Sequence, residues 1–377
     1  MNRLERLFFQ KTSSANLQFD SLDGLRGLAV LFVVLSHLSN AGFSLASVLD
    51  FAGSGKYGVF LFFVLSAFLL TFPLIGRTTK QFRDAPFWSS YALRRVLRIF
   101  PLYIVVLLVS YLFSTRYPTP YVIPLSGTEL LDHLALQAGK SIYWTVPVEF
   151  KYYLVLPFVA AGFALLRRGR LGWGLCGVAA VLAALHWLWP AHESRMNTVE
   201  LIPYLPIFLL GSLAAFVHWK IQQRGGIDSP VLRAGLEVLA LASLLGVVSL
   251  VPSFWNALPG REVNPFHFHR DFLLFGFLWS VFVVAYLNGS GAFRWLLATR
   301  PLRYIGVVSF SVYLWHLPIL VLVGNHLRAD PALVALAVIA LALLFSGISY
   351  LLIERPFIRT RLARRLIALP ASWGRPR

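Results

Sequence analysis

Two basic side chains in the first apolar run of this sequence have the spacing of a functional pair. The run begins Asp23-Gly-Leu-Arg26-Gly and reaches His37 eleven residues after the arginine. Eleven residues make three helical turns plus about 20°, so Arg26 and His37 share one helix face, roughly 16 Å apart along its axis. Asp23 is close enough to pair with Arg26. An imidazole embedded in a span is a candidate general base. The alternative is that both residues are structural: Arg26 would lie at the level of the lipid headgroups, and His37 would form a hydrogen bond with a neighbouring helix.

A second basic group lies at the start of the third apolar run, in the sequence Arg94-Arg95-Val-Leu-Arg98. Arg95 and Arg98 are three residues apart, so a helix presents their guanidinium groups side by side. Guanidinium forks match the geometry of phosphate oxygens. The pair is therefore a candidate site for a phosphate-bearing substrate, and the alternative is ordinary anchoring by arginines that flank a span on the cytoplasmic side.

An acidic residue among aromatic ones opens the fourth apolar run, in the sequence Trp144-Thr-Val-Pro147-Val-Glu149, with Tyr153 one turn further on. Pro147 lacks a backbone donor, and near the start of a helix it can open a polar pocket. In that setting Glu149 could orient a base or bind a sugar hydroxyl. It could equally be a structural partner of an arginine on another span.

Two further motifs lie near the end of the chain. His316 stands two residues before Pro318 in the ninth run, where we expect a packed, hydrogen-bonded histidine. Glu354-Arg355 closes the tenth run, where we expect a local ion pair that anchors the bundle. The sequence has no glycine-rich phosphate loop, no His-Glu-x-x-His helix and no Gly-x-Ser-x-Gly elbow. The spacing of histidines and carboxylates suggests no metal site.

The elements that position these residues are predicted transmembrane helices. Hydrophobic residues make up 58% of the 377 positions and charged residues only 13%, against roughly 25% charged in soluble domains. A run of about 20 apolar residues can cross a bilayer core of roughly 30 Å. Gly58 and Ser66, in the second run, indicate close helix packing. Ten such runs lie at residues 22–40, 58–76, 96–115, 142–166, 172–190, 199–218, 232–252, 271–288, 304–325 and 331–353.

The basic residues predict the orientation of these spans. A net charge of +18 could indicate nucleic acid, but the lysines and arginines lie mostly in short connections between apolar runs. Segments on one side of the membrane hold 24 of them and segments on the other side 7, and the alternation never breaks. Lys and Arg concentrate in cytoplasmic loops. We therefore predict an all-α bundle of about ten spans with both termini cytoplasmic. Residues 1–20 form a tail, 21–358 the bundle and 359–377 a basic tail, all in one domain.

Together these motifs resemble those of the acyltransferase family 3 membrane proteins. They run in family order from residue 21 to about 358. The sequence departs from the family at Phe60, where many relatives have an acidic residue, and at Ala67, which is often glycine. The matching motifs are Asp23-Gly-Leu-Arg26-Gly through His37, Gly58-Val-x-Leu-Phe-Phe-Val-Leu-Ser66, Arg95-x-x-Arg98-Ile-x-Pro101-x-Tyr103, Trp144-Thr-Val-x-Val-Glu149-x-x-Tyr152-Tyr153, Ser311-x-Tyr313-Leu-Trp315-His316 and Glu354-Arg355-Pro356-Phe357.

The resemblance implies a multi-pass O-acyltransferase of the bacterial inner membrane. Such a protein moves an acyl group, commonly acetyl, from cytoplasmic acyl-coenzyme A to a hydroxyl of a surface glycan, lipopolysaccharide or glycolipid precursor. His37 would be the general base, Glu149 would orient the base or a substrate, and Arg95 and Arg98 would hold the donor phosphates with help from Arg26. The other candidate substrate- or donor-binding residues are Asp23, Trp144, Tyr153 and His316.

The partners implied are membrane lipid, acyl-coenzyme A as a co-substrate, and a glycan or glycolipid acceptor. No nucleic acid, tightly bound cofactor or metal is expected. The main alternative is a transporter or flippase for a glycolipid or small amphiphile, which would use Arg26 and His37 as a relay. A lipid-linked sugar transferase is a second alternative. The sequence shows no internal repeat, which weighs against repeat-built transporters. Some members of the family append an esterase-like domain, and we expect none here.

Overall fold

The computed structural model describes residues 5–9, 17–46, 50–77, 79–116, 120–256, 264 and 267–359, and these residues form helices and no strand. The long helices are α2 (Leu17–Asn40), α3 (Gly55–Ile75), α5 (Ala85–Thr115), α7 (Thr145–Leu166), α8 (Leu171–Leu188), α9 (Leu205–Gln223), α10 (Pro230–Ser249), α12 (Phe272–Asn288), α15 (Ser309–His326) and α16 (Pro331–Ser349). The short α-helices are α1 (Glu5–Phe8), α4 (Thr79–Phe82), α6 (Gly127–Leu134), α11 (Pro252–Asn256), α13 (Ala292–Leu297), α14 (Arg300–Val307) and α17 (Arg355–Arg359). The remaining turns are η2 (Ser141–Trp144), η3 (Ala191–Glu193), η4 (Ile202–Tyr204), η5 (His267–Arg270) and the π-helical η6 (Tyr350–Glu354).

The all-α fold class predicted from the sequence is confirmed, and every predicted apolar run coincides with a helix. Within the described residues, eight helices are long and apolar enough to cross a membrane. The eighth run is a shorter apolar helix, α12, and the ninth is split into α14 and α15, which meet at an angle of 78°. The count of ten spans and the cytoplasmic termini remain predictions. Most of the two predicted tails lies outside the described residues.

The predicted orientation can be tested with reporters that are active on only one side of the membrane. We expect cytoplasmic signals for fusions after residues 20, 168 and 377, because the Lys- and Arg-rich connections should face the cytoplasm. Fusions after residues 128 and 262 should report from the opposite side. A non-cytoplasmic signal at either terminus, or a cytoplasmic one at 128 or 262, would overturn the topology.

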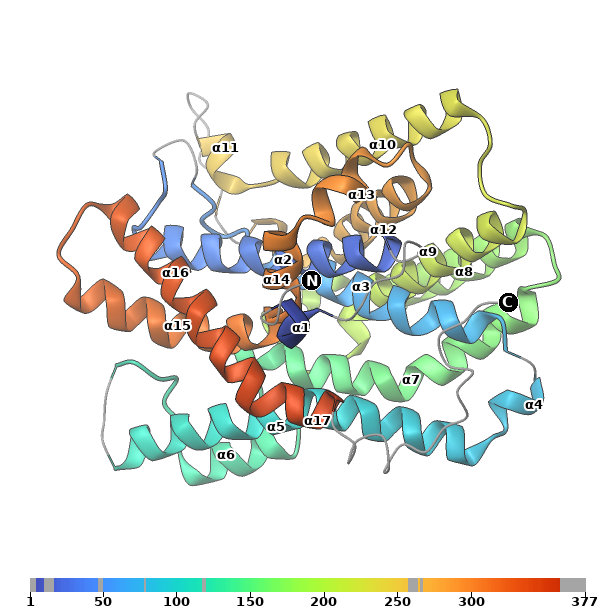
Figure 1. The fold of residues 1–377 in the computed structure, drawn as a ribbon. Coiled ribbons are helices and arrows are strands. Elements are labelled where there is room, and N and C mark those ends of the chain that lie inside the picture. Colours follow the sequence, from blue (N-terminus) through green and yellow to red (C-terminus); the bar gives the residue numbers. More distant parts are fainter. Residues whose placement is uncertain are drawn as a thin grey trace.

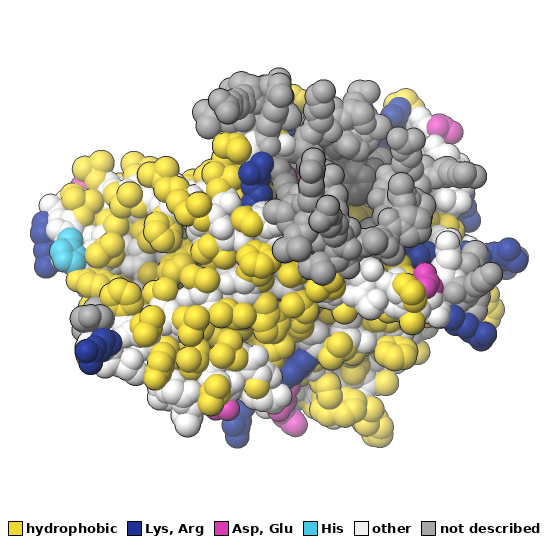
Figure 2. All heavy atoms as spheres, turned by 60° about the horizontal axis from the view of Figure 1, so that its bottom comes forward, with side chains coloured by type: hydrophobic (Ala, Val, Ile, Leu, Met, Phe, Trp, Pro, Cys, Tyr) yellow, Lys and Arg dark blue, Asp and Glu magenta, His cyan; other side chains and the backbone are white. Residues whose placement is uncertain are grey.

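The helices divide into an interior group and a group with an apolar outer surface. In the most apolar 18-residue stretch of each helix, 67% of the residues of α2 and 72% of those of α3 are buried. The corresponding shares for α8 and α10 are only 11% and 17%. Large apolar side chains of the outer helices are exposed, among them Trp173 and Val231. Figure 1 shows α2 and α3 running through the centre of the bundle, and Figure 2 shows a broad hydrophobic face with charged side chains mostly along its rim. This is the surface expected of a protein whose solvent is lipid.

Glycines bring the backbone of α2 into direct contact with the segment that precedes α15. A Cβ atom added to Gly24 would lie 1.7 Å from the carbonyl oxygen of Leu297, and one added to Gly306 would lie 1.7 Å from the carbonyl oxygen of Asp23. Gly27 also lies close to α14, because its added Cβ would be 2.4 Å from the carbonyl oxygen of Leu302. No side chain fits between these helices. The start of α2, which carries Arg26, is therefore held against the bend that leads into α15.

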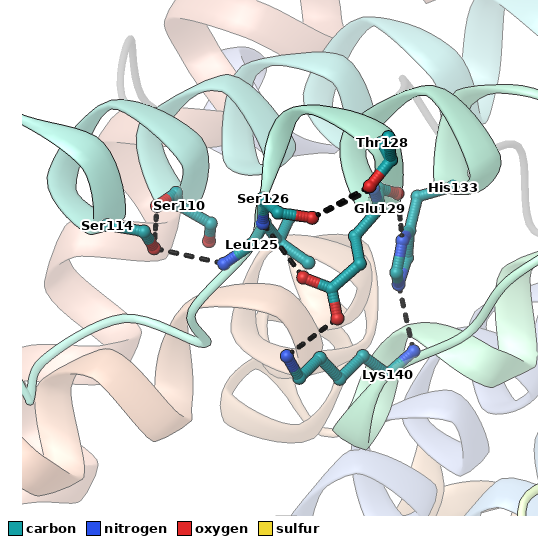
Figure 3. Close-up of polar contacts among 8 residues, drawn as sticks. All are labelled: Ser110, Ser114, Leu125, Ser126, Thr128, Glu129, His133 and Lys140. Atoms are coloured by element: carbon teal, nitrogen blue, oxygen red, sulfur yellow. Dashed lines mark hydrogen bonds and ion pairs between the residues drawn. The ribbon is translucent and has the colours of Figure 1, made fainter.

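The connection before α7 is a folded cap in its described part, residues 120–141. Figure 3 shows its polar core, in which Ser126 and Glu129 form a capping box at the start of α6 and Lys140 binds the Glu129 carboxylate at 2.8 Å. Hydrogen bonds from Lys140 and from the Ser126 amide lower the pKa of Glu129 to about 2. His133 donates from Nδ1 to the Glu129 carbonyl and accepts at Nε2 from the Lys140 amide. This network fixes the chain just before η2 and α7, the helix that carries Glu149.

Candidate active site

Five residues singled out from the sequence surround one cavity inside the bundle. Arg26 comes from α2, Arg95 and Arg98 from α5, and Glu149 and Tyr153 from α7. The cavity has a volume of about 60 Å³, which is room for a few water molecules. We call it the inner cavity. The separate basic motifs of the sequence are thus parts of one site.

The Glu149 carboxylate is held by neutral donors and faces positive charge. It accepts a hydrogen bond from Tyr153 Oη at 2.6 Å and a second, short one from Ser66 Oγ. Arg26 lies within electrostatic reach of Glu149. The Arg95 guanidinium stands 5.9 Å from the centre of the Tyr153 ring, a cation–π contact that restricts both side chains. Glu149 therefore has a fixed orientation and an arginine of another helix nearby, and its role stays a prediction.

A second cavity, of about 50 Å³, adjoins the inner one. The two share Arg26, Ser66, Glu149 and Phe310. The second cavity, which we call the middle cavity, is lined in addition by Val59, Phe62, Phe63, Thr145, Val146, Ser309 and Tyr313. It leads from the arginines along α3, α7 and α15.

His37 does not line either cavity but faces a second histidine. The rings of His37 and His316 are 5.1 Å apart between centroids. His316 Nδ1 contacts the carbonyl oxygens of Val312 at 3.1 Å and Tyr313 at 2.7 Å, so this nitrogen carries the proton and donates. In a neutral imidazole the other nitrogen then has a free lone pair. His316 Nε2 is buried and has no hydrogen-bond partner in the described structure.

The histidine pair is linked to the middle cavity by Tyr313. The Tyr313 ring lies 6.1 Å from the His316 ring and lines the cavity. Its hydroxyl donates to the Ile142 carbonyl at 2.7 Å and accepts from Thr145 Oγ1 at 3.2 Å. The site therefore has three parts in sequence along α2: an arginine-lined end, a small middle cavity and a histidine pair.

The remaining predicted residues lie at the edges of this arrangement. Asp23 is within electrostatic reach of Arg26 and Arg98 and supports the arginine cluster. Trp144 does not line either cavity. It stacks on Tyr204, with ring centroids 4.9 Å apart, and Lys56 Nζ stands 5.5 Å from its ring. Its position indicates that it packs beside the site.

Three polar residues that the sequence did not identify as functional belong to the site. Ser66, interpreted from the sequence as part of a packing helix, binds Glu149 and lines both cavities. Ser309 and Tyr313 line the middle cavity. The signal that could have found them is a hydroxyl in an otherwise apolar span.

The partner of Glu354 also differs from the local ion pair with Arg355 that we expected from the sequence. The carboxylate is buried and accepts a hydrogen bond from Ser311 Oγ at 2.5 Å, instead of pairing locally with Arg355. It lies within electrostatic reach of Arg26 and Arg98. Glu354 is the last residue of the π-helical turn η6, where the regular α-helical register ends. Its carboxyl thus lies beside the arginine-lined end.

This arrangement could bind an anionic group at one end and accept a proton at the other. Three guanidinium groups at one end can bind phosphate oxygens, and an imidazole pair at the other end can accept a proton. Among the described residues, no group of three His, Cys, Asp or Glu side chains could hold a metal ion.

Comparison with known proteins identifies the family of this chain. Residues 19–351 match the family model described as an acyltransferase domain. The chain is 26% identical over 366 residues to the peptidoglycan O-acetyltransferase OatA of Listeria monocytogenes, covering 89% of this chain and 55% of that protein. It is 23% identical to the O-acetyltransferase OatA of Staphylococcus aureus, covering 99% of this chain and 61% of that one.

The putative peptidoglycan O-acetyltransferase YrhL of Bacillus subtilis is 26% identical, over 90% of this chain and 55% of its own length. The chain thus spans little more than half the length of these relatives. No solved structure matches. Because the family model covers nearly all of the helix bundle, including the arginine cluster and both histidines, the chain belongs to the membrane acyltransferases of acyltransferase family 3.

Proposed function

We propose that this protein is an O-acyltransferase of the bacterial inner membrane. It transfers an acyl group, in the first place acetyl, from cytoplasmic acyl-coenzyme A to a hydroxyl of a surface glycan, lipopolysaccharide or glycolipid precursor. The observation that carries this proposal is a pair of facing histidines near two adjoining cavities, the inner of which is lined by three arginines. The relatives named as O-acetyltransferases support it.

The donor fits the site from the predicted cytoplasmic side. Its phosphates bind Arg95 and Arg98, whose guanidinium groups converge on the inner cavity with Arg26. Arg26 and His37 are about 16 Å apart along α2 at 1.5 Å per residue. The pantetheine arm of coenzyme A is a long, thin chain, and the middle cavity, of about 50 Å³, widens by side-chain movement to let it cross this interval. The thioester then reaches the histidine pair.

The transfer needs a base, because a hydroxyl is a weak nucleophile at neutral pH. In the proposed step the acceptor hydroxyl gives its proton to the His37 imidazole as its oxygen bonds to the thioester carbon. The carbon–sulfur bond then breaks, and the leaving thiolate takes the proton from the imidazolium. His316 lies 5.1 Å from the His37 ring between centroids, and its unpaired Nε2 is the acceptor that orients the His37 ring once the substrates are bound. Glu149 fixes Arg26 and Tyr153 at the donor end.

The acceptor approaches from the opposite side of the membrane. Among the relatives, OatA of Listeria monocytogenes is named for peptidoglycan, and a cell-surface glycan is the acceptor class that we propose for this chain. His37 lies in the last turns of α2, toward the outer connections of the predicted topology. A hydroxyl entering from that side meets the thioester at the histidine pair.

A purified sample in lipid nanodiscs tests the proposal directly. We expect acetyl-coenzyme A to be consumed, with release of free thiol that increases when a glycan acceptor with free hydroxyls is added. Thiol release is followed with a chromogenic reagent, and the acylated product by mass spectrometry. A transporter or flippase would instead move glycolipid across the membrane of proteoliposomes without consuming acetyl-coenzyme A. That result would refute the proposed enzymatic function.

A further inference from the structure

The break in the ninth apolar run places a helix start at the cavities. α14 and α15 meet at Val308 with a bend of 78°, and the glycine contacts with α2 hold α14 in place. As a result the first turn of α15 lines the site, with Ser309 in the middle cavity and Phe310 in both cavities. Broken membrane helices commonly direct the positive end of a half-helix at an anionic substrate group.

The first turn of α15 has donors without helical partners. The first bond of the helix runs from the Val312 amide to the Val308 carbonyl at 2.9 Å, and no side chain caps this end. The amides of residues 309–311 therefore have no acceptor within the helix, and the helix dipole makes this end positive. An anion is the ligand that such a helix start binds best.

Two side chains at the same place are also unsatisfied. Ser309 is fully buried, and its hydroxyl has no hydrogen-bond partner in the part of the chain that the structure describes. Arg26 Nε, which lines the same cavity, is likewise buried without a partner. A buried polar group without a hydrogen bond costs folding free energy. A ligand with several acceptor oxygens would satisfy both groups at once.

We propose that the start of α15, together with Ser309 and Arg26, binds the phosphate that joins the pantetheine arm of the acyl-coenzyme A donor to its nucleotide. This rests on the proposed function, because it assigns one group of that donor to one place. Glu149 is the carboxylate facing this site, and its Oε1 accepts from both Ser66 and Tyr153. Ser309 Oγ and Arg26 Nε have no partner in the described structure and are the donors open to the phosphate.

The spacing along α15 argues for a phosphate rather than the reacting carbonyl. Ser309 and His316 are seven residues apart, about 10 Å along the helix axis. A general base must lie within about 2.6–3.2 Å of the proton it takes, so a carbonyl bound at Ser309 would be out of reach of the histidine pair. A phosphate there leaves the pantetheine arm to cover the interval.

The test compares two probes on the full chain in nanodiscs: coenzyme A, and pantetheine, which lacks phosphate. In Ser309→Ala we expect coenzyme A affinity to fall about tenfold or more, since hydrogen bonds to charged groups are the stronger ones. Pantetheine affinity should stay unchanged. The melting temperature without ligand should be unchanged or higher, because the variant removes a buried, unpaired hydroxyl.

Ser311→Ala is the matched control. Ser311 is also fully buried on the first turn of α15, but its hydroxyl binds Glu354. This variant should lower the melting temperature and leave the ratio of the two affinities at its original value. Unchanged coenzyme A affinity in Ser309→Ala, or an equal loss for both probes, would overturn the phosphate site while leaving the proposed function intact. Failure of the unmodified protein to bind coenzyme A would remove both.

Discussion

His37→Ala should reduce acyl transfer about 10²- to 10⁴-fold, the usual effect of removing a general base. The structure strengthens this expectation, because His37 faces His316 at 5.1 Å and no hydrogen bond ties its ring to the described protein. A ring placed only for packing would be expected to have a fixed partner. The measurement is acceptor acylation under saturating donor, with donor binding measured in the same sample. Donor binding should persist, since the arginine-lined end is untouched.

His218→Ala is the control for the loss of a buried histidine. His218 is buried, more completely than His37, and its Nδ1 bonds Asn288 in another part of the bundle. This variant should lower the melting temperature with little effect on the transfer rate of the folded fraction. Near-normal turnover in His37→Ala would make His37 a structural residue. His316 or Glu149 would then be the leading candidate for the base.

The sequence could predict the helices and the functional ends of α2 because both depend on local patterns. Apolar runs define helices, and the spacing of Arg26 and His37 places them on one face whatever the helix packs against. The resemblance to a known family then grouped the distant motifs into one site. The arginine cluster around the inner cavity follows that grouping.

Other features depend on how distant helices meet, which no local pattern shows. His316 was expected as a packed histidine, and it becomes a partner of His37 only because α15 packs against α2. The bend between α14 and α15, which exposes Ser309 to the middle cavity, follows from glycine contacts with α2. The inward position of Glu354 coincides with the end of a π-helical turn that has no clear sequence signal.

These tertiary contacts matter for the charge balance of the donor end. Arg26, Arg95 and Arg98 meet Glu149 and Glu354 inside the bundle, so the arginines are partly neutralised before any ligand binds. A buried group of charges is stable only if it is well paired. The phosphates of the proposed donor would therefore gain from orientation and hydrogen bonds as well as from net charge, which favours bidentate arginine contacts over simple attraction.

Replacing Arg95 and Arg98 together with Gln should weaken the binding of acyl-coenzyme A by a few kcal/mol, because each charge-assisted hydrogen bond contributes about 1.5–3 kcal/mol. Glutamine keeps a polar, hydrogen-bonding side chain of moderate length, so insertion should be largely preserved. Some loss of stability is expected, because Arg98 lies within electrostatic reach of the buried Glu354 carboxyl, which loses this favourable neighbour in the variant. Donor affinity and melting temperature should both be measured.

The matched control is the double substitution Arg168→Gln with Arg170→Gln. These two arginines are exposed on the short α7–α8 connection, on the same predicted side of the membrane, and neither lines the inner cavity. Removing them takes away the same charge near the cytoplasmic surface, so any general effect on orientation or electrostatic attraction appears equally in both variants. Only a contact with phosphate inside the cavity makes the Arg95 and Arg98 variant lose affinity while the control retains it. If both bind the donor like the unmodified protein, the arginines of α5 anchor the helix and the phosphates bind elsewhere.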